Sequence, residues 1–457
     1  MKTTLPTIGS LTMLAAATLL AFPAAAQTNA ELAQRIEALQ QRVNEQAQEL
    51  SRVGTKTESL EDTRDANGIK QLKISGYMDP TFISNRAQNR AGFQFLNGVG
   101  DNGYSYDNSS FGVVSLDFQK ETDSGAKYRL TIVPYRGTES VGRFQNRIVN
   151  EASLAVPLGD PTTFLIAGHI PDWSGYEYIP ANQNKLITHN LLVDLTLPAT
   201  YTGAGLQTVS GKWTVKGMLA NVNSSIKNAG AKTPALVYRG DYAATEYFGF
   251  GFAGLHGKVA NPTQNVTHTE LVLDQVSSTA ALPVFINSNV VDAQGDSRAD
   301  LFEVDTFFIR GDLTLNGQLS FGRQQKASIT PDPISTDLRT AQWWGLSALA
   351  AYKVNPRWEV VARADFINNR KNGGGLFTYA TPDGINGIGP SQSGGDAEVG
   401  ANRSALSFGT SYVLDPSTTI KAEYRLDRAS QAVFVNVKDG SFGKTNSLVG
   451  AAVVVSF

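Results

Sequence analysis

An alternation of apolar and polar residues that starts at Gln71 and continues to the end of the chain limits the possible folds more than any other feature of this sequence. In residues 420–427, for example, charged side chains at odd-numbered positions alternate with Ile, Ala, Tyr and Leu at even-numbered positions. A period of two residues is that of a β-strand with one polar and one apolar face. The sequence therefore predicts an all-β fold from residue 71 onward.

Short and long connections alternate between these segments. Most short ones contain Gly, Asn, Asp or Pro, and the long ones are rich in Gly, Asn, Asp and Ser, as solvated loops are. Counting the segments gives about sixteen strands, an even number within the range of transmembrane barrels. We therefore predict a transmembrane antiparallel β-barrel whose first and last strands begin and end on the side of the short turns. The predicted short turns are 122–125, 159–161, 210–211, 244–245, 315–317, 355–357 and 415–417, and the predicted long loops are 84–109, 137–148, 172–198, 222–233, 260–300, 327–340, 370–402 and 430–445.

The charged face of the strands is expected to line the lumen, since a barrel of about sixteen strands encloses an aqueous channel. Both signs of charge occur, often on one strand. Such charges either neutralise one another or set up a transverse field that favours polar solutes. Because no ladder of one sign appears, strong ion selectivity is not expected. The predicted lumen residues are Lys73, Asp79, Asp117, Arg129, Lys216, Arg239, Asp241, Glu303, Asp305, Glu359, Arg363, Asp365, Lys421, Glu423, Arg425 and Asp427.

The last twelve residues, NSLVGAAVVVSF, form one further alternating segment that ends on Phe457. This segment resembles the closing strand of bacterial outer-membrane β-barrels. In that family the terminal aromatic residue is read by the barrel-assembly machinery, and the resemblance implies the same role for Phe457. It also implies contact of the apolar face with outer-membrane lipid.

The first seventy residues have a different pattern. Residues 1–26 have a short apolar core followed by three Ala, the layout of a cleavable signal peptide. Residues 27–62 contain apolar residues at alternating steps of four and three, which predicts a coiled coil of about four heptads. A single amphipathic helix lying on the barrel is the alternative. Residues 63–70 form a linker, and residues 71–457 form the barrel.

A coiled coil ahead of a barrel resembles the sucrose and phosphate porins, which are trimers. The resemblance implies a homotrimer with its coiled coil in the periplasm.

The predicted loop 172–198 is more apolar than an exposed loop tolerates, because it contains Ile187, Leu191, Leu192 and Leu195. It resembles by position the loop of general porins that folds into the barrel and narrows the channel. Residues 187–192 and 202–205 also resemble a segment of the OmpL-like putative β-barrel porins. The expected constriction residues are Asp172, Glu177, Lys185, His189 and Asp194.

Signals of other functions are weak. The formal net charge of -2 gives no reason to expect nucleic-acid binding, and the absence of Cys excludes thiolate metal sites. The string GxGxxG at residues 249–254 lies within a predicted strand with no helix after it, so nucleotide binding is not expected. The four His are too scattered for a zinc site, and we expect no metal, cofactor or catalytic residue.

These patterns together predict an outer-membrane porin that allows small hydrophilic solutes to diffuse through a water-filled barrel. One alternative is a structural barrel tethered to the periplasm through its coiled coil. Another is a barrel enzyme such as an outer-membrane phospholipase, although no Ser/His pair at the rim supports it.

Overall fold

The computed structural model describes Val43 and residues 71–96, 111–134, 148–224, 234–273, 286–377 and 381–457, with backbone alone for residues 262–273 and 286–294. The predicted signal peptide (1–26), coiled coil (27–62, Val43 apart) and linker (63–70) lie outside these residues. In the described parts of the chain, no helix combines the length and apolar character needed to cross a membrane.

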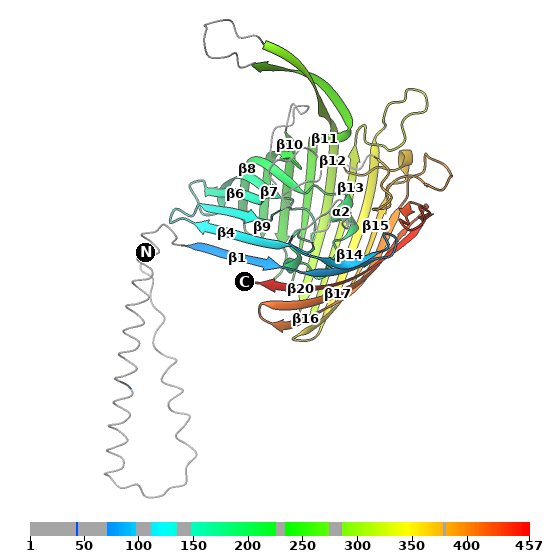
Figure 1. Ribbon diagram of the computed structural model, residues 1–457. Coiled ribbons are helices and arrows are strands. Elements are labelled where there is room, and N and C mark those ends of the chain that lie inside the picture. Colours follow the sequence, from blue (N-terminus) through cyan, green and yellow to red (C-terminus); the bar gives the residue numbers. More distant parts are fainter. Residues whose placement is uncertain are drawn as a thin grey trace, which may run out of the picture. The chain divides into compact units, whose positions relative to one another are not determined.

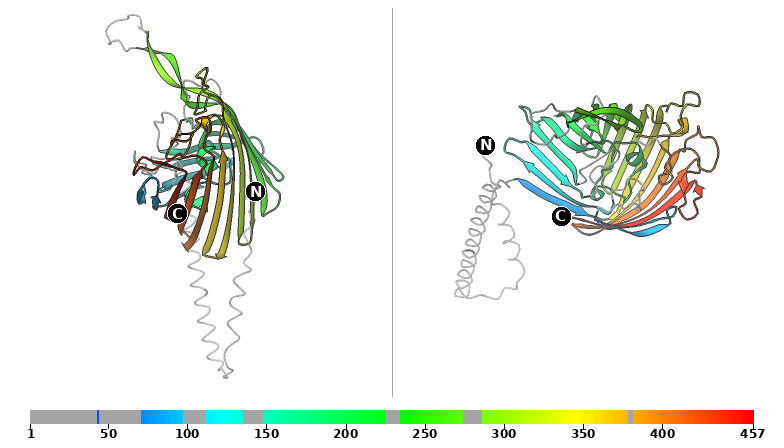
Figure 2. Two further views of the ribbon diagram at one scale, coloured as in Figure 1. Left: turned by 90° about the vertical axis from the view of Figure 1, so that its right-hand side faces the viewer. Right: turned by 45° about the horizontal axis from the view of Figure 1, so that its top comes forward.

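A single antiparallel sheet closes on itself to form the barrel (Figures 1 and 2). Closure occurs where β20 pairs with β17 on one side and with β1 and β2 on the other. The strands of this sheet are β1 Leu72–Met78, β2 Thr81–Asn85, β3 Arg90–Gln94, β4 Val114–Glu121, β5 Lys127–Ile132, β6 Val149–Pro157, β7 Thr163–Pro171, β8 Thr200–Ser210, β9 Trp213–Val222, β10 Ala235–Ala243, β11 Phe248–Leu273, β12 Ile286–Arg310, β13 Leu313–Gln324, β14 Ala341–Asn355, β15 Trp358–Asn368, β16 Arg403–Asp415, β17 Thr418–Ala429 and β20 Thr445–Ser456.

Two of the spanning strands are interrupted. β1 and β2 form one, β3 and β4 form the next, and β1 pairs with β4 while β2 pairs with β3. Each pair counts once, so the barrel has 16 strands, which confirms the predicted antiparallel barrel of about sixteen strands. A small separate sheet is formed by β18 (Phe434–Val435) and β19 (Phe442–Gly443).

The break between β1 and β2 is fixed by Asp79. Its carboxylate accepts hydrogen bonds from the backbone N–H groups of Gly112 and Val113, and the residue is only 1% exposed. Pro80 follows and has no N–H to offer a neighbouring strand. Asp79, one of the predicted lumen residues, therefore lies buried at the junction where the first strand changes partner.

The inner face of the barrel is polar and its outer face is apolar, which is the reverse of a soluble protein. On β17, Lys421, Glu423 and Arg425 are buried on the inner face, whereas Tyr424 and Leu426 are exposed on the outer face. The same alternation holds along β14, β15 and β20. An apolar face turned outward is stable only against lipid, so the fold is that of a membrane-spanning barrel.

Three predicted connections were wrong. The predicted loop 84–109 contains β3 (Arg90–Gln94), which pairs with β2. The Asn–Gly at residues 316–317 resembles a turn, yet Gly317 pairs with Thr306 inside β13. The turn lies at Gly311–Asp312, where Gly311 has the positive φ of 61° that such a turn requires. The predicted loop 260–300 is also shorter, because β11 continues to Leu273 and β12 starts at Ile286, forming the long hairpin in Figure 1. The extended ends of β11 and β12 are rich in polar residues, so their sequence does not predict strands.

Candidate functional site

The connection between β7 and β8, here called the inner loop (residues 172–199), folds into the barrel. Its ends meet where the Asp172 N–H donates to the Ala199 carbonyl at 2.8 Å. It contains the 3-10 helix η2 (Ala181–Gln183) and the short helix α2 (Leu191–Leu195), which lies inside the ring of strands (Figure 1). Asn190 caps α2 by accepting from the N–H groups of Leu192 and Val193.

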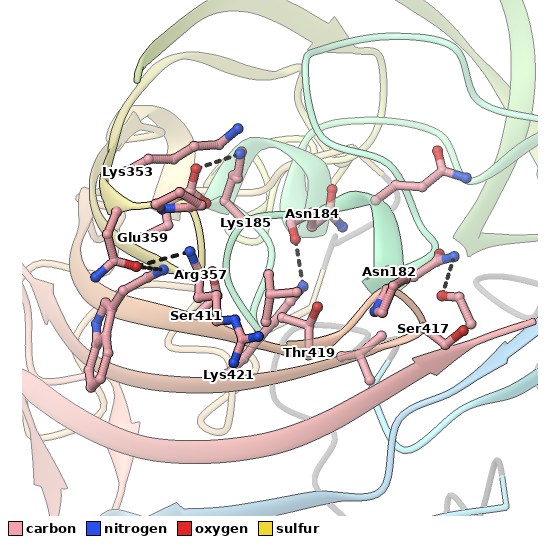
Figure 3. Close-up of a pocket in the computed structure, with 18 residues that line it drawn as sticks. Asn182, Asn184, Lys185, Lys353, Arg357, Glu359, Ser411, Ser417, Thr419 and Lys421 are labelled. Carbon is pink, nitrogen blue, oxygen red and sulfur yellow. Dashed lines mark hydrogen bonds and ion pairs between the residues drawn. The ribbon is translucent and has the colours of Figure 1, made fainter. Parts of the chain in front are cut away.

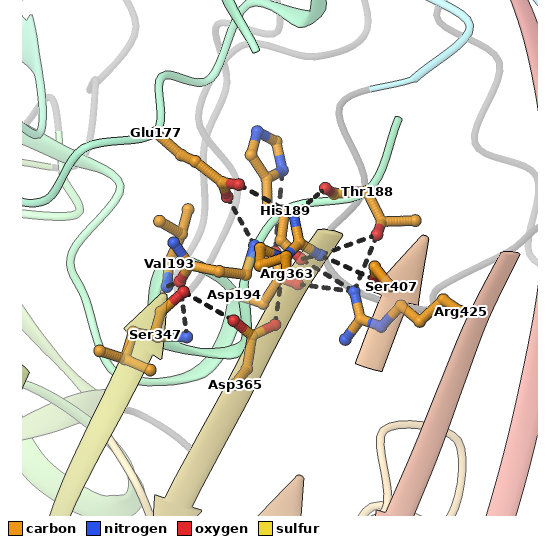
Figure 4. Close-up of polar contacts among 12 residues, drawn as sticks. Glu177, Thr188, His189, Val193, Asp194, Ser347, Arg363, Asp365, Ser407 and Arg425 are labelled. Carbon is orange, nitrogen blue, oxygen red and sulfur yellow. Dashed lines mark hydrogen bonds and ion pairs between the residues drawn. The ribbon is translucent and has the colours of Figure 1, made fainter. Parts of the chain in front are cut away.

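Arg363 of β15 holds the inner loop from the opposite wall (Figure 4). Its guanidinium donates to Glu177 Oε1 at 2.8 Å, to the Thr188 carbonyl at 2.6 Å and to the His189 carbonyl at 2.7 Å. Its Nε donates to Asp365 Oδ2 at 3.1 Å. The side chain is fully buried, and a guanidinium has five N–H groups in a rigid fork. One residue thus joins two loop carbonyls and two carboxylates.

β17 adds a second set of polar anchors. Glu423 accepts from the backbone N–H groups of Ile187 and Thr188, both at 2.8 Å. Arg425 donates to the His189 carbonyl at 2.8 Å. Lys421 donates to the carbonyls of Ala181 and Asn184. These bonds hold η2 against β17 near the short-turn end of the barrel. The charges predicted to line the lumen here bind the backbone of the inner loop.

Apolar contacts complete the docking. Leu191, Leu192 and Leu195 of α2 are at most 3% exposed and belong to a cluster of inward-facing residues from the strands. Glycines on the wall make room for the loop: a Cβ at Gly409 would collide with Leu186. Along β14 to β17 the interior is therefore packed, although strand number alone favoured water there.

The other wall carries its own charges. Arg239 of β10 is paired with Asp305 of β12 at 2.7 Å and donates to the Trp173 carbonyl of the inner loop at 2.8 Å. Lys216 of β9 lies over the Trp173 ring, 4.5 Å from its centre. Three other predicted lumen residues form ion pairs on this wall: Asp117 with Arg129 on β4 and β5, and Asp241 with Arg239 on β10.

Two cavities open at the short-turn end of the barrel. One, of about 420 Å³, is lined by Lys73, Lys127, Arg129, Glu151 and Lys216 on the β1–β9 wall. The other, of about 380 Å³, lies between the inner loop and the β14–β20 wall (Figure 3). Its charged lining residues are Lys185, Lys353, Arg357, Glu359 and Lys421.

His189 is buried in the middle of the inner loop. Its Nε2 donates to the Tyr178 carbonyl at 2.9 Å, and its Nδ1 lies 3.8 Å from Asp194 Oδ1. Burial lowers the pKa of His189 to about 4, and the positive charges of Arg363 and Arg425 act in the same direction. The imidazole is therefore neutral at neutral pH.

Acidification is expected to loosen the inner loop. The pKa of His189 is about 4 in the docked loop and near its ordinary 6.5 in a released loop, so docking is complete above pH 6.5 and weakens as the pH falls toward 4. The difference between these two pKa values corresponds to about 3 kcal/mol in the free energy of docking. The rate of amide hydrogen exchange in the inner loop at pH 7, 5 and 4 measures the weakening.

The control for this experiment is His189→Gln, which keeps a donor for the Tyr178 carbonyl and does not titrate. The carboxyl groups of Glu177, Asp194 and Glu423 are present in both proteins, so the comparison isolates His189. If the variant shows the same pH dependence as the natural protein, His189 is not the responsible group.

The structure brings three of the five predicted constriction residues together. Glu177, His189 and Asp194 are brought together beside Arg363 and Arg425. Lys185 pairs with Glu359 at 2.8 Å, and Asp172 accepts from Tyr201 and Ser174 at the base of the loop.

Sequence reasoning missed several residues of the site. Tyr176 bonds Ser347 at 2.6 Å, Trp173 contacts Lys216, and Arg357 and Lys353 line the cavity in Figure 3. The alternation along β14 places Ser347 and Lys353 on the inner face, so this pattern could have predicted both as lumen residues. Nothing in the sequence paired Tyr176 with a strand.

The fold and the site define a class: a membrane-spanning β-barrel of 16 strands with a loop folded into its interior. The chain matches, over residues 6–457, the family described as Protein of unknown function (DUF3138), and it belongs to that family. No curated protein sequence resembles it at a significant level.

Solved structures of similar fold share little sequence with the chain. Outer-membrane expressed OmpT of Vibrio cholerae has a TM-score of 0.49 and 10% identity, covering 84% of this chain and 97% of that one. The anion-selective porin from Comamonas acidovorans has a TM-score of 0.48 and 9% identity, with coverage of 84% and 99%. Salmonella typhi OmpF in complex with daunomycin has a TM-score of 0.49 and 12% identity, with coverage of 84% and 97%.

Proposed function

We propose that the protein is an outer-membrane porin through which small hydrophilic solutes diffuse passively. The observation that carries this proposal is the inner loop, held across a barrel with a polar interior by Arg363 and by the charged face of β17. An outward apolar face holds such a barrel in lipid, and a charged interior keeps a path wet. The inner loop then sets the size limit.

The solute path runs beside the inner loop along the β1–β9 wall. Lys73 and Lys127 are exposed there, and the Arg129 side chain is 41% exposed although it is paired with Asp117. These residues and the cavity that they line contrast with the packed β14–β17 wall. In this assignment the lumen charges of β1 to β9 contact solute, Arg363, Glu423 and Arg425 position the constriction, and the charges around the cavity at the short-turn end of β14 to β17 act on ions at the mouth.

The finer assignments follow from the sequence. The constriction consists of residues 172–198 and includes Asp172, Glu177, Lys185, His189 and Asp194. Residues 1–26 direct export, and residues 27–62 hold three copies together in the periplasm as a coiled coil. The heptad pattern supports the coiled coil, and the resemblance to the sucrose and phosphate porins supports three copies.

The cavity of about 380 Å³ between the inner loop and the β14–β20 wall gives the pore a weak preference for anions. Four cationic side chains and one carboxylate line it: Lys185, Lys353, Arg357, Lys421 and Glu359. Glu359 is engaged by Lys185, and no carboxylate among the described residues forms an ion pair with Lys353 or Arg357. A net positive mouth raises the local concentration of anions.

Neutralising two of these cations is expected to reduce that preference. In Lys353→Gln/Arg357→Gln the anion-to-cation permeability ratio should fall about twofold, because the mouth loses two charges that act within about one Debye length. The reversal potential in a potassium chloride gradient measures this ratio. Lys212→Gln/Arg310→Gln is the matched control, since both cations lie at the same end but outside the cavity. Equal shifts in the two double variants would contradict the assignment.

A further inference from the structure

The outer surface of β11 to β15 changes abruptly from apolar to charged at the long-loop end. Phe302 of β12 is the register partner of Phe321 on β13, and Phe321 is the partner of Trp344 on β14. All three face outward and are 38–46% exposed. They form an aromatic row across three neighbouring strands, a position typical of the membrane interface.

A charged row lies two residues further toward the long loops. His256, Asp300 and Arg323 are register partners on β11, β12 and β13. Two residues beyond them, Lys258 pairs in register with Arg298. Residues separated by two positions lie about 6.7 Å apart along a strand and on the same face. The charges therefore point outward, immediately above the aromatic row.

Asp300 is shared by three partners, two guanidinium groups and one imidazole. It lies 3.0 Å from Arg323 Nε, 3.4 Å from Arg298 Nε and 3.1 Å from His256 Nδ1. The side chains of Arg298 and Arg323 are 59% and 60% exposed, and the Nη groups of Arg323 have no partner among the residues that the structure describes. Both guanidinium groups are thus held in place with donors still available.

The local charge is positive. We define the rim cluster as Lys258, Arg298, Arg323 and Lys371 with His256, Asp296 and Asp300. Its four Lys and Arg outnumber its two carboxylates even after Lys258 pairs with Asp296 at 3.2 Å. Lys371 donates to Gln342 at 3.0 Å beside Trp344. A hollow of about 740 Å³ is lined by members of both the charged and the aromatic row.

We propose that the rim cluster binds the phosphorylated headgroup of a membrane lipid whose acyl chains lie on the aromatic row. Guanidinium groups bind phosphate oxygens in a bidentate manner, and a pre-positioned pair loses little entropy on binding. The rim cluster lies where the exposed apolar row of the outer face ends, which is where a lipid headgroup sits. The inference rests on the proposed insertion in a membrane but not on solute transport.

Lipid binding is tested with the full-length protein in detergent micelles. Phosphatidic acid with brominated acyl chains is the probe, because it carries a phosphate monoester and quenches nearby tryptophan fluorescence. The contribution of Trp344 is the difference between the protein and its Trp344→Phe variant. Brominated phosphatidylcholine, with no net charge, is the reference lipid.

Phosphatidic acid is expected to quench Trp344 at concentrations about tenfold lower than phosphatidylcholine, and Arg298→Gln/Arg323→Gln should remove this difference. Arg428→Gln/Lys444→Gln, exposed at the same end of the barrel, should retain it. Lys258→Gln/Lys371→Gln should weaken binding in the same direction, which provides a second variant if the first folds poorly.

Equal quenching by the two lipids, or equal loss in the rim and control variants, would overturn the proposal. Displacement of the lipid by millimolar inorganic phosphate would also overturn it, since the site would then be one for free phosphate. Channel conductance of Arg298→Gln/Arg323→Gln in a neutral bilayer should match that of the natural protein. If neither the natural protein nor this variant conducts, the porin function is refuted, whereas the proposal of a lipid site still stands.

Discussion

Replacing Arg363 with Gln is expected to release the inner loop and raise the single-channel conductance several-fold. The substitution removes the guanidinium that binds Glu177, the Thr188 carbonyl and the His189 carbonyl, and it leaves Glu177 and Asp365 buried without their main cation. Removing one partner of a buried ion pair costs about 3–5 kcal/mol. The loop can relieve this cost by leaving the wall, whereas the strands cannot.

Two further substitutions make the Arg363 experiment specific. Arg363→Lys keeps the charge but lacks the planar fork, so its conductance should lie between those of the natural protein and Arg363→Gln. Arg428→Gln removes an exposed arginine from β17 and should change nothing. If Arg363→Gln folds to a heat-resistant barrel and conducts like the natural protein, Arg363 does not hold a constriction.

Replacement of residues 175–197 by a four-residue Gly–Ser linker is expected to produce the largest increase in conductance and in the size of solute that passes. The ends of the loop are already joined by the 2.8 Å bond from Asp172 to Ala199, so a short linker spans the gap without strain on β7 or β8. A barrel of this strand number is wide enough for an aqueous channel once its interior is empty. Planar-bilayer recording and liposome swelling with sugars of increasing mass measure the two effects.

The barrel itself should survive this replacement. Arg363 retains Asp365, Arg425 retains Asp427, and water replaces the loop carbonyls. The apolar residues that packed on α2 become exposed to the channel, so a lower melting temperature is expected. Unchanged conductance and size limit in a correctly folded variant would show that the inner loop is not the constriction.

The barrel could be predicted from sequence because its physical signal is local. Each strand shows its period of two by itself, as in β17, and most short turns carry Gly, Asn, Asp or Pro next to the alternation. The failure at residues 315–317 has the same origin, because Asn–Gly has the composition of a turn even where register keeps it in β13. The polar parts of β11 and β12 lack an apolar face and gave no strand signal.

The interior could be predicted only in part, because its contacts join distant residues. The apolar side chains of the inner loop indicated that it packs on something, but not that Leu192 lies against Gly345 or Ile187 against Gly450. Alternation placed Arg363 and Glu423 on the inner face, yet it left open whether they meet water or protein. Their burial follows from the path of the inner loop across the barrel, which no local pattern specifies.

Single-channel conductance of the refolded protein in a planar bilayer tests the central claim most directly, with a salt gradient to obtain the reversal potential. The porin assignment predicts stable conductance steps, grouped in threes for each inserted assembly, with a weak preference for anions. A silent bilayer from protein that has folded into a heat-resistant barrel would contradict it and would make the inner loop a plug.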